Sequence, residues 1–157
     1  MKKKKLYGIL FYILTAEGIG GLSALITGSF SDFFLTYQKP PILPPGWLFP
    51  VVWTVLYALM GYSAYLISRE RADMGKRCRA LTVYWFQLAL NFSWSIIFFR
   101  LELLWLGFVI IALLLLSVIV MTVLFGRISP KAGKLNIPYI IWVAFAAYLN
   151  LATAVIN

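Results

Sequence analysis

The 157-residue chain has no histidine and a single cysteine, Cys78. Because histidine and cysteine are the usual ligands of zinc, a metal site of that kind is excluded, and Cys78 has no partner for an intramolecular disulfide. Acidic residues number five, most of them in the connecting segments. A conventional acid–base pair is therefore not expected. We predict neither a metal nor a resident cofactor.

Charge is also scarce. Charged residues make up 12% of the chain, whereas hydrophobic residues make up 62% and aromatic residues 17%. So little polar surface cannot cover a water-soluble domain. Five apolar runs approach the roughly 20 residues that cross a bilayer as a helix. They cover residues 6–27, 47–68, 80–99, 103–125 and 136–156. We predict an all-α integral membrane protein, a single domain over residues 1–157, with a bundle of five transmembrane helices.

The basic residues predict how these helices are oriented. Twelve of the fourteen Lys and Arg residues lie in segments 2–5, 69–79 and 127–134, whereas Lys39 and Arg100 lie in the alternate connections. Basic connections stay on the cytoplasmic side, so the N-terminus is expected inside and the C-terminus outside. The net charge of +9 follows from these connections and from their attraction to anionic headgroups. We therefore expect a lipid bilayer, and not nucleic acid, as the partner of the basic segments.

The first apolar run begins like a signal peptide, with four lysines ahead of it. It is longer than a signal core and carries Glu17 in its middle, so we expect it to remain as a helix. A carboxylate there is costly unless it is neutral, paired or near water. Its candidate roles are a glutamic acid bonded to a neighbouring helix and a proton-coupling group. In the same run, Gly20, Ala24 and Gly28 form a series that allows close helix approach, within the bundle or across a homodimer.

The segment between the first two runs, residues 28–46, is rich in proline. Five of the seven prolines lie between Pro40 and Pro50. Paired prolines hold a chain extended, and Pro50 falls in the first turn of the second helix, where its missing N–H costs nothing. The apolar composition of the segment predicts that it docks onto the bundle. We interpret it as a stiff, ligand-covering lid, with an ordinary rigid connector as the alternative.

Three of the predicted helices carry stripes that mix aromatic residues with amides. The stripes comprise Trp53, Tyr57, Gly61 and Tyr65; Gln87, Asn91, Trp94 and Phe98; and Trp142, Ala146 and Asn150. Recurrence every three or four residues puts each set on one helical face. Amides in hydrocarbon need partners, so these amides face the interior, where they join helices or line a cavity. Their aromatic neighbours favour the cavity, because ligand pockets are mostly apolar with a few polar groups.

Three segments also carry a family resemblance. They are Lys39-Pro40 with Pro44-Pro45-Gly46-Trp47-x-Phe49-x-x-x-Trp53, Tyr57 and Met60-Gly61-Tyr62; Gln87-Leu88-Ala89-Leu90-Asn91-Phe92-Ser93-Trp94 with Phe98-Phe99; and Pro138-Tyr139-x-x-Trp142-x-x-Phe145 with Leu149-Asn150. Together they resemble the translocator protein family, which includes tryptophan-rich sensory proteins and mitochondrial benzodiazepine receptors. The resemblance covers essentially the whole chain. The chain is identified as a bacterial member, which implies a multi-pass protein of the cytoplasmic (inner) membrane.

The resemblance implies a five-helix bundle, often a homodimer, with a pocket closed by the first loop. The residues it implies as ligand-binding are Pro44, Trp47, Phe49, Trp53, Tyr57, Asn91, Trp94, Trp142 and Ala146. Family members bind porphyrins such as protoporphyrin, as ligands and not as cofactors, and isoquinoline and benzodiazepine drugs. Some are linked to light-dependent porphyrin breakdown through paired tryptophans, here Trp53 and Trp142, which we expect to face each other across the pocket. A role in tetrapyrrole or stress regulation is thereby implied, with a porphyrin-degrading catalyst or a transporter of hydrophobic or cationic solutes as alternatives.

Two positions depart from the family pattern. Ile42 stands where the family commonly has a tryptophan, so one aromatic wall of the loop is missing. The sterol motif of animal members needs a basic residue after its tyrosine, and none follows Tyr148. That motif therefore gives no support for sterol binding.

Overall fold

The computed structural model describes residues 2–28 and 30–157, which form helices joined by short connections. The helices are α1 (Lys2–Thr27), α2 (Phe30–Thr36), α3 (Leu48–Arg69), α4 (Met74–Ser95), α5 (Leu104–Ile128), α6 (Pro130–Leu135) and α7 (Ile137–Ile156), and a π-helical turn, η1 (Ile96–Arg100), continues α4. In this described part of the chain, five helical segments are long and apolar enough to cross a membrane. The predicted all-α membrane bundle is confirmed.

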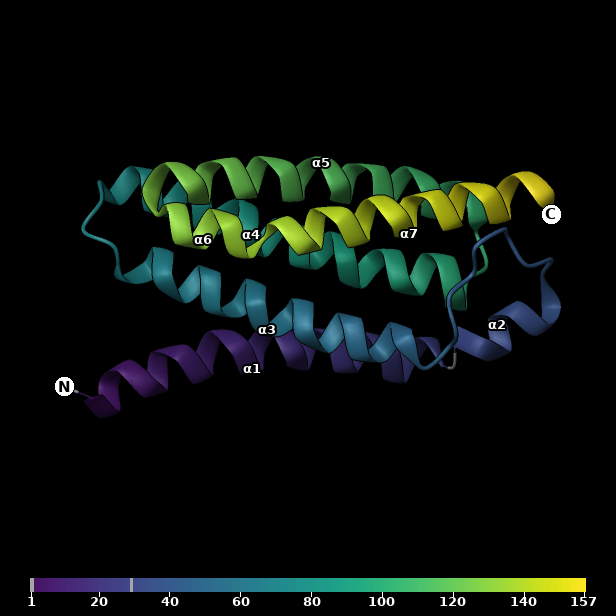
Figure 1. The fold of residues 1–157 in the computed structure, drawn as a ribbon, viewed down its shortest axis with the longest axis horizontal. Helices are drawn as coiled ribbons and strands as arrows, with labels where there is room; N and C mark the ends of the chain where they lie inside the picture. Colours follow the sequence, from purple (N-terminus) through teal and green to yellow (C-terminus); the bar gives the residue numbers. More distant parts are fainter. Residues whose placement is uncertain (1, 29) are drawn as a thin grey trace.

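The long helices lie side by side along the longest axis of the molecule (Figure 1). Helix α1 packs on α3, and α5 packs against both α4 and α7. The N-terminal end of α1 lies with the α3–α4 and α5–α6 connections at one end of the bundle. Helix α2 and the end of α7 lie at the other. The three basic segments therefore share one end, which we call the basic end, and the first loop lies at the opposite, lid end.

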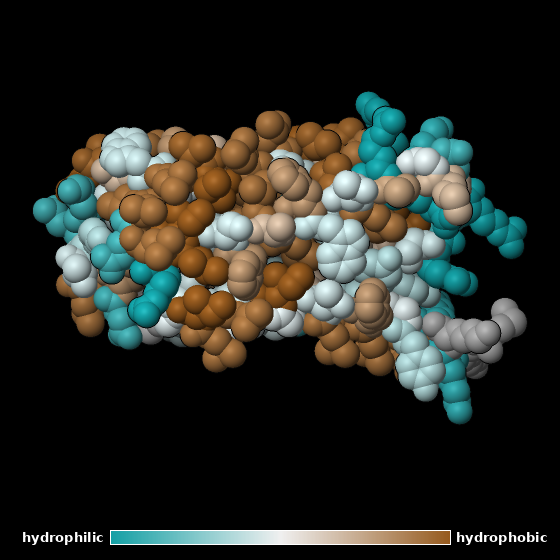
Figure 2. Space-filling model, turned by 180° about the vertical axis from the view of Figure 1, so that it is seen from behind, coloured by the Kyte–Doolittle hydropathy of each residue, from teal (hydrophilic) through white to brown (hydrophobic). Residues whose placement is uncertain are grey.

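The outside of the bundle matches a bilayer. On the face seen in Figure 2, hydrophobic residues form a belt across the middle of the molecule, with hydrophilic residues gathered at the two ends. Large apolar side chains on the belt point outward; Leu14, Leu116 and Ile141 are each more than half exposed. In water such a surface would drive aggregation, but against lipid tails it costs nothing. The bundle is thus built for hydrocarbon on its sides and water at its ends.

Some helices begin earlier than the apolar runs predicted. Helix α4 starts at Met74, six residues before the third run, because the Asp73 carboxylate accepts a hydrogen bond of 3.0 Å from the Lys76 amide and caps the helix. Helix α1 likewise includes lysines ahead of the first run. Helix α3 starts at Leu48 with Pro50 in its first turn, as predicted. Apolar runs thus locate membrane crossings, whereas caps locate helix ends.

The first loop contains a helix that the sequence analysis did not predict. This helix, α2, buries Phe33 and Phe34 at the lid end of the bundle. The Phe33 ring centroid lies 4.9 Å from that of Phe98 and 5.2 Å from that of Phe99, both in η1. The predicted docking of the loop onto the bundle is therefore confirmed.

Two glycines let helices meet backbone to backbone. A Cβ atom built on Gly61 in α3 would lie 2.8 Å from the Ile13 Cα atom of α1. One built on Gly133 in α6 would lie 2.7 Å from the Gly126 Cα atom of α5. Small residues at such crossings allow the close packing that holds helices together where lipid supplies no hydrophobic driving force.

Candidate ligand-binding pocket

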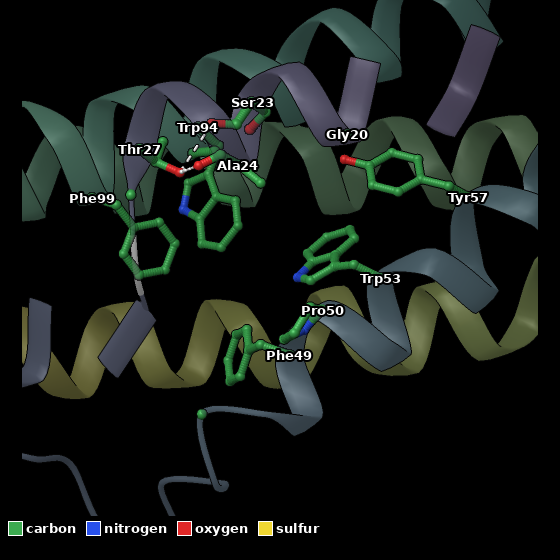
Figure 3. A pocket seen from close by; sticks show the side chains of 13 residues that line it. Gly20, Ser23, Ala24, Thr27, Phe49, Pro50, Trp53, Tyr57, Trp94 and Phe99 are labelled. Carbon is green, nitrogen blue, oxygen red and sulfur yellow. Dashed lines mark hydrogen bonds between the residues drawn. The ribbon is translucent and has the colours of Figure 1, made fainter. Parts of the chain in front are cut away.

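A cavity of about 280 Å³ lies between α1, α3 and the end of α4, in the half of the bundle nearer the lid. Figure 3 shows side chains from all three helices converging on it. Its lining comprises Gly20, Ser23, Ala24, Thr27, Gly28, Gly46, Phe49, Pro50, Trp53, Tyr57, Trp94, Ser95 and Phe99. Exposed lining residues occur on α1 (Ala24) and on α3 (Pro50), so the pocket is open on that side.

The α1 wall consists of small residues. Gly20, Ser23, Ala24 and Thr27 all present short side chains or none, which leaves room inside the bundle. A Cβ atom on Gly20 would collide with the Tyr57 ring. The Thr27 hydroxyl donates a hydrogen bond of 3.0 Å to the Ser23 carbonyl of its own helix. This wall therefore offers space and backbone with little polar chemistry.

Aromatic rings form the opposite walls, with Trp53 at the centre. Its ring centroid lies 5.6 Å from Tyr57, 6.2 Å from Trp94 and 6.2 Å from Tyr139. Trp94 stacks on Phe98 at 5.9 Å. Rings at these distances support one another while leaving indole faces for a ligand.

Hydrogen bonds on the side away from the pocket fix the orientation of Trp94. Its indole N–H donates a hydrogen bond of 3.1 Å to the Oδ1 atom of Asn150, and the Asn150 amide donates one of 2.9 Å to the Leu104 carbonyl. Asn150 thereby ties α4, α5 and α7 together. The face of Trp94 that lines the pocket is held by this buried network.

A second buried network fixes Tyr57. Its hydroxyl donates to Asn91 Oδ1 at 2.9 Å, Asn91 Nδ2 donates to the Tyr139 hydroxyl at 2.8 Å, and that hydroxyl donates to Gln87 Oε1 at 2.7 Å. All four residues are buried. The amides therefore join α3, α4 and α7, the first of the two roles considered for them, and they lie outside the lining of the pocket. They act on the pocket through Tyr57, whose ring they hold in place.

Four of the residues implied by the resemblance line this pocket, namely Phe49, Trp53, Tyr57 and Trp94. Five do not: Pro44, Trp47, Asn91, Trp142 and Ala146. Trp47 is 67% exposed, and Ala146 borders a separate small cavity of about 10 Å³.

Trp142 does not face Trp53 across the cavity. It is not part of the lining and packs edge-on against Phe49, with ring centroids 5.3 Å apart. Its indole N–H is buried without a hydrogen-bond partner among the described residues. Direct ligand contact by Trp142 stays a prediction.

The α1 wall is what the analysis of functional residues missed. Gly20, Ala24 and Gly28 were interpreted as a surface for helix packing, since small residues serve that purpose in membranes. The neighbouring residues distinguish a pocket wall from a packing surface: Ser23 and Thr27 lie on the same helical face as these three small residues. Here the small and hydroxyl residues of this face leave the space that the aromatic residues of α3 and α4 enclose.

Polar contacts tie the loop over the lid end of the bundle. The Tyr37 hydroxyl donates a hydrogen bond of 2.8 Å to Glu102 Oε2, between η1 and α5. Asn157 pairs with the backbone of Gln38, accepting from its amide at 2.8 Å and donating to its carbonyl at 3.3 Å. These bonds join the loop to both the α4–α5 connection and the end of α7. From the described part of the loop, Gly28 and Gly46 reach the pocket lining.

Comparison with known proteins shows to which family the chain belongs. Residues 11–156 match the model of the TspO/MBR family. The chain belongs to the TspO/MBR family. Membership that extends from α1 to α7 includes every helix that lines the pocket. The family resemblance read from the sequence is therefore confirmed.

Individual TspO/MBR relatives are similar in sequence to this chain over most of their own length. The tryptophan-rich protein TspO of Chlorobaculum tepidum is 35% identical over 81% of this chain and 80% of its own. Protein CrtK of Rhodobacter capsulatus is 34% identical over 97% of this chain and 92% of its own. The translocator protein of Homo sapiens is 36% identical over 82% of this chain and 76% of its own. The chain is a multi-pass membrane protein of this family.

Proposed function

We propose that this protein binds porphyrins and other flat hydrophobic ligands in the pocket between α1, α3 and α4, in a role linked to tetrapyrrole or stress regulation. The observation that carries the proposal is the cavity itself, which has the Trp53 and Trp94 indoles in its wall and small residues opposite. Flat aromatic ligands suit such walls, because stacking adds to the burial of a large apolar area. The family resemblance points to the same ligand class.

The size and opening of the pocket fit this ligand class. A volume of about 280 Å³ lies just below the range of small-molecule sites, which span roughly 300–1,000 Å³, so the cavity holds part of such a ligand. A tetrapyrrole is a broad, thin plate, so one edge enters between the indoles and the α1 wall. The rest extends through the open side at Ala24 and Pro50 toward the surrounding lipid.

Substituting Trp53 tests the proposal. In Trp53→Phe, loss of the central indole should cost on the order of 1–3 kcal/mol, or roughly ten- to hundredfold in affinity for protoporphyrin. Trp105→Phe is the matched control, because Trp105 is 60% exposed on the outside of α5. The measurement is a titration of purified protein in the dark. If Trp53→Phe binds like the control, the pocket is not the porphyrin site.

Light-dependent porphyrin breakdown is a second candidate. It is favoured by one observation: Trp53 and Trp94 lie with ring centroids 6.2 Å apart beside the cavity, so a bound porphyrin would meet two oxidisable indoles. Illumination of the same samples in air separates the two candidates. Breakdown requires a porphyrin absorbance that falls under light in the wild type and persists in Trp53→Phe; an unchanging spectrum leaves binding as the function.

We also propose a homodimer in the cytoplasmic membrane of a bacterium. Relatives from bacteria and the exposed apolar faces of the bundle support this placement. Crosslinking in native membranes at ordinary expression should give a species of twice the chain mass. Recovery of monomer alone under conditions that crosslink a known dimer would refute the dimer.

A further inference from the structure

Glu17 is an acidic residue within a membrane-crossing helix. The other four, Asp32, Glu70, Asp73 and Glu102, lie in the connections or at the lid end. The Glu17 side chain is half-buried, and no hydrogen bond or ion pair joins its carboxylate to another described residue. A carboxylate at this depth is expensive unless something pairs with it or protonates it. The chain itself therefore leaves this group open to a partner.

The position of Glu17 on α1 puts it beside the pocket. It precedes Gly20, Ala24 and Gly28 by three, seven and eleven residues, spacings that share one helical face, and all three line the pocket. Gly20 is the residue that meets the Tyr57 ring, and Glu17 precedes it by one helical turn. The carboxylate thus stands one turn below the pocket, on the side of the basic end.

No cation of the described chain is placed to neutralise it. The lysines and arginines lie in the connections or near the helix ends, well away from the middle of α1. The pocket wall is instead made of indole and phenol rings, whose negative faces attract a cation. Glu17 is not among the lining residues, but a carboxylate one helical turn beyond the cavity and aromatic faces on its wall together favour a positive charge at that end of the pocket.

We propose that Glu17 is a specificity-determining residue that makes the pocket prefer flat aromatic ligands carrying a protonated amine. The amine pairs with the Glu17 carboxylate while the aromatic part lies against Trp53 and Trp94. This inference rests on the proposed function, because it requires the pocket to hold a ligand. For a porphyrin, whose side chains are acidic, the same carboxylate directs the acids away from itself, toward the lid end where Lys39 and Arg100 lie.

The test uses two probes of one shape. One is a naphthalimide bearing a dimethylaminopropyl chain, which is protonated at neutral pH, and the other bears a branched alkyl chain of equal length. Each is titrated against protein in nanodiscs of phosphatidylcholine, a lipid without net charge, and tryptophan fluorescence is followed. The wild type should bind the amine probe about tenfold or more tightly, as expected for a charge pair removed from water.

Three variants complete the experiment. Glu17→Gln should erase the preference for the amine while leaving affinity for the neutral probe unchanged, which also shows that the variant is folded. Glu17→Asp should keep part of the preference. Glu70→Gln removes a carboxylate outside the membrane and should behave as the wild type.

The outcomes that overturn the proposal are distinct. A preference that persists in Glu17→Gln, or an equal loss for both probes, shows that the charge of Glu17 does not select the ligand. If Glu17→Gln changes the mass of the oligomer but keeps the preference for the amine probe, Glu17 lies in a contact between two copies of the chain and does not select the ligand. If the wild type binds protoporphyrin but neither probe, the inference fails and the proposed function stands; if it binds none of the three, both fail.

Discussion

At the scale of single residues, the shape of the pocket depends on a glycine, which has no side chain, as much as on the aromatic and amide side chains around it. Gly20 makes room for the Tyr57 ring, and Asn91 holds that ring by its hydroxyl. Because the ring is fixed at both ends, neither partner can shift to admit a larger group. The shape of the cavity at this point is therefore determined by one absent methyl group and one amide.

A glycine substitution tests this dependence. Gly20→Ala puts a Cβ atom against the Tyr57 ring, so we expect the free energy of unfolding to fall by about 1–3 kcal/mol and porphyrin binding to weaken. Thermal unfolding and the porphyrin titration measure the two effects. Gly21→Ala is the control, since a Cβ atom there meets nothing within 4 Å. Equal behaviour of the two variants would show that the Tyr57 ring moves aside freely.

At the scale of helices and loops, the sequence located the crossings better than the pocket. Apolar runs marked all five crossings because hydrocarbon demands them, and the proline pattern placed the start of α3 correctly. Periodicity gave the face on which Trp53 and Trp142 lie, but it says nothing about which helix each face meets. Hence Trp53 lines the cavity with α1 and α4, while Trp142 packs on Phe49.

Other elements left little trace in the sequence. The π-helical turn η1 adds one residue to a helical turn, so that Phe99 lines the pocket while Phe98 is buried beside it. Nothing in the local composition distinguishes this turn from α-helix. Helix α2 was missed for a different reason: it is too short for periodicity to be measured, and its aromatic residues were attributed to a docked loop.

The loop should loosen when its bond to Glu102 is removed. In Tyr37→Phe the ring still stacks on Phe33 at 4.8 Å, but the hydrogen bond to Glu102 is lost. An exposed bond of about 1 kcal/mol corresponds to roughly fivefold faster hydrogen exchange in residues 37–46. Tyr7→Phe, on the outside of α1, is the control and should leave that exchange unchanged.

The same bond gives the loop a pH dependence. Burial, and then the neighbouring Glu102 carboxylate, raise the pKa of the Tyr37 hydroxyl. The docked loop thus favours the protonated phenol, so the contribution of this bond is complete below the ordinary phenol pKa of about 10 and is lost as the pH rises through the raised value. In strongly alkaline solution, exchange corrected for its intrinsic rate should converge on that of Tyr37→Phe. If the corrected exchange rates of the wild type and Tyr37→Phe still differ at that pH, the pH dependence does not come from the Tyr37–Glu102 bond.

At the scale of the whole molecule, the five crossings in the described part of the chain put the start of α1 and the end of α7 on opposite sides of the membrane. The three basic segments share the end that we predict to be cytoplasmic. Cys78 lies exposed at that end, in the first turns of α4. The native thiol is therefore a reporter of orientation.

Thiol labelling tests the predicted orientation. Cys78 should resist a membrane-impermeant maleimide in intact cells and react in inverted vesicles. Lys39→Cys in a Cys78→Ser background should show the reverse, because Lys39 is exposed in the connection between α2 and α3, at the lid end. Labelling of Cys78 from outside the cell would invert the topology.

The closeness of Trp53 and Trp94 has an optical consequence. Two indoles whose centroids are 6.2 Å apart are close enough to exchange excitation energy before they emit. A ligand that quenches the fluorescence of one ring therefore also reduces the emission of the other. The fraction of emission lost on binding overstates the number of tryptophans in contact with the ligand, so the midpoint of a titration, and not its amplitude, should be compared between variants.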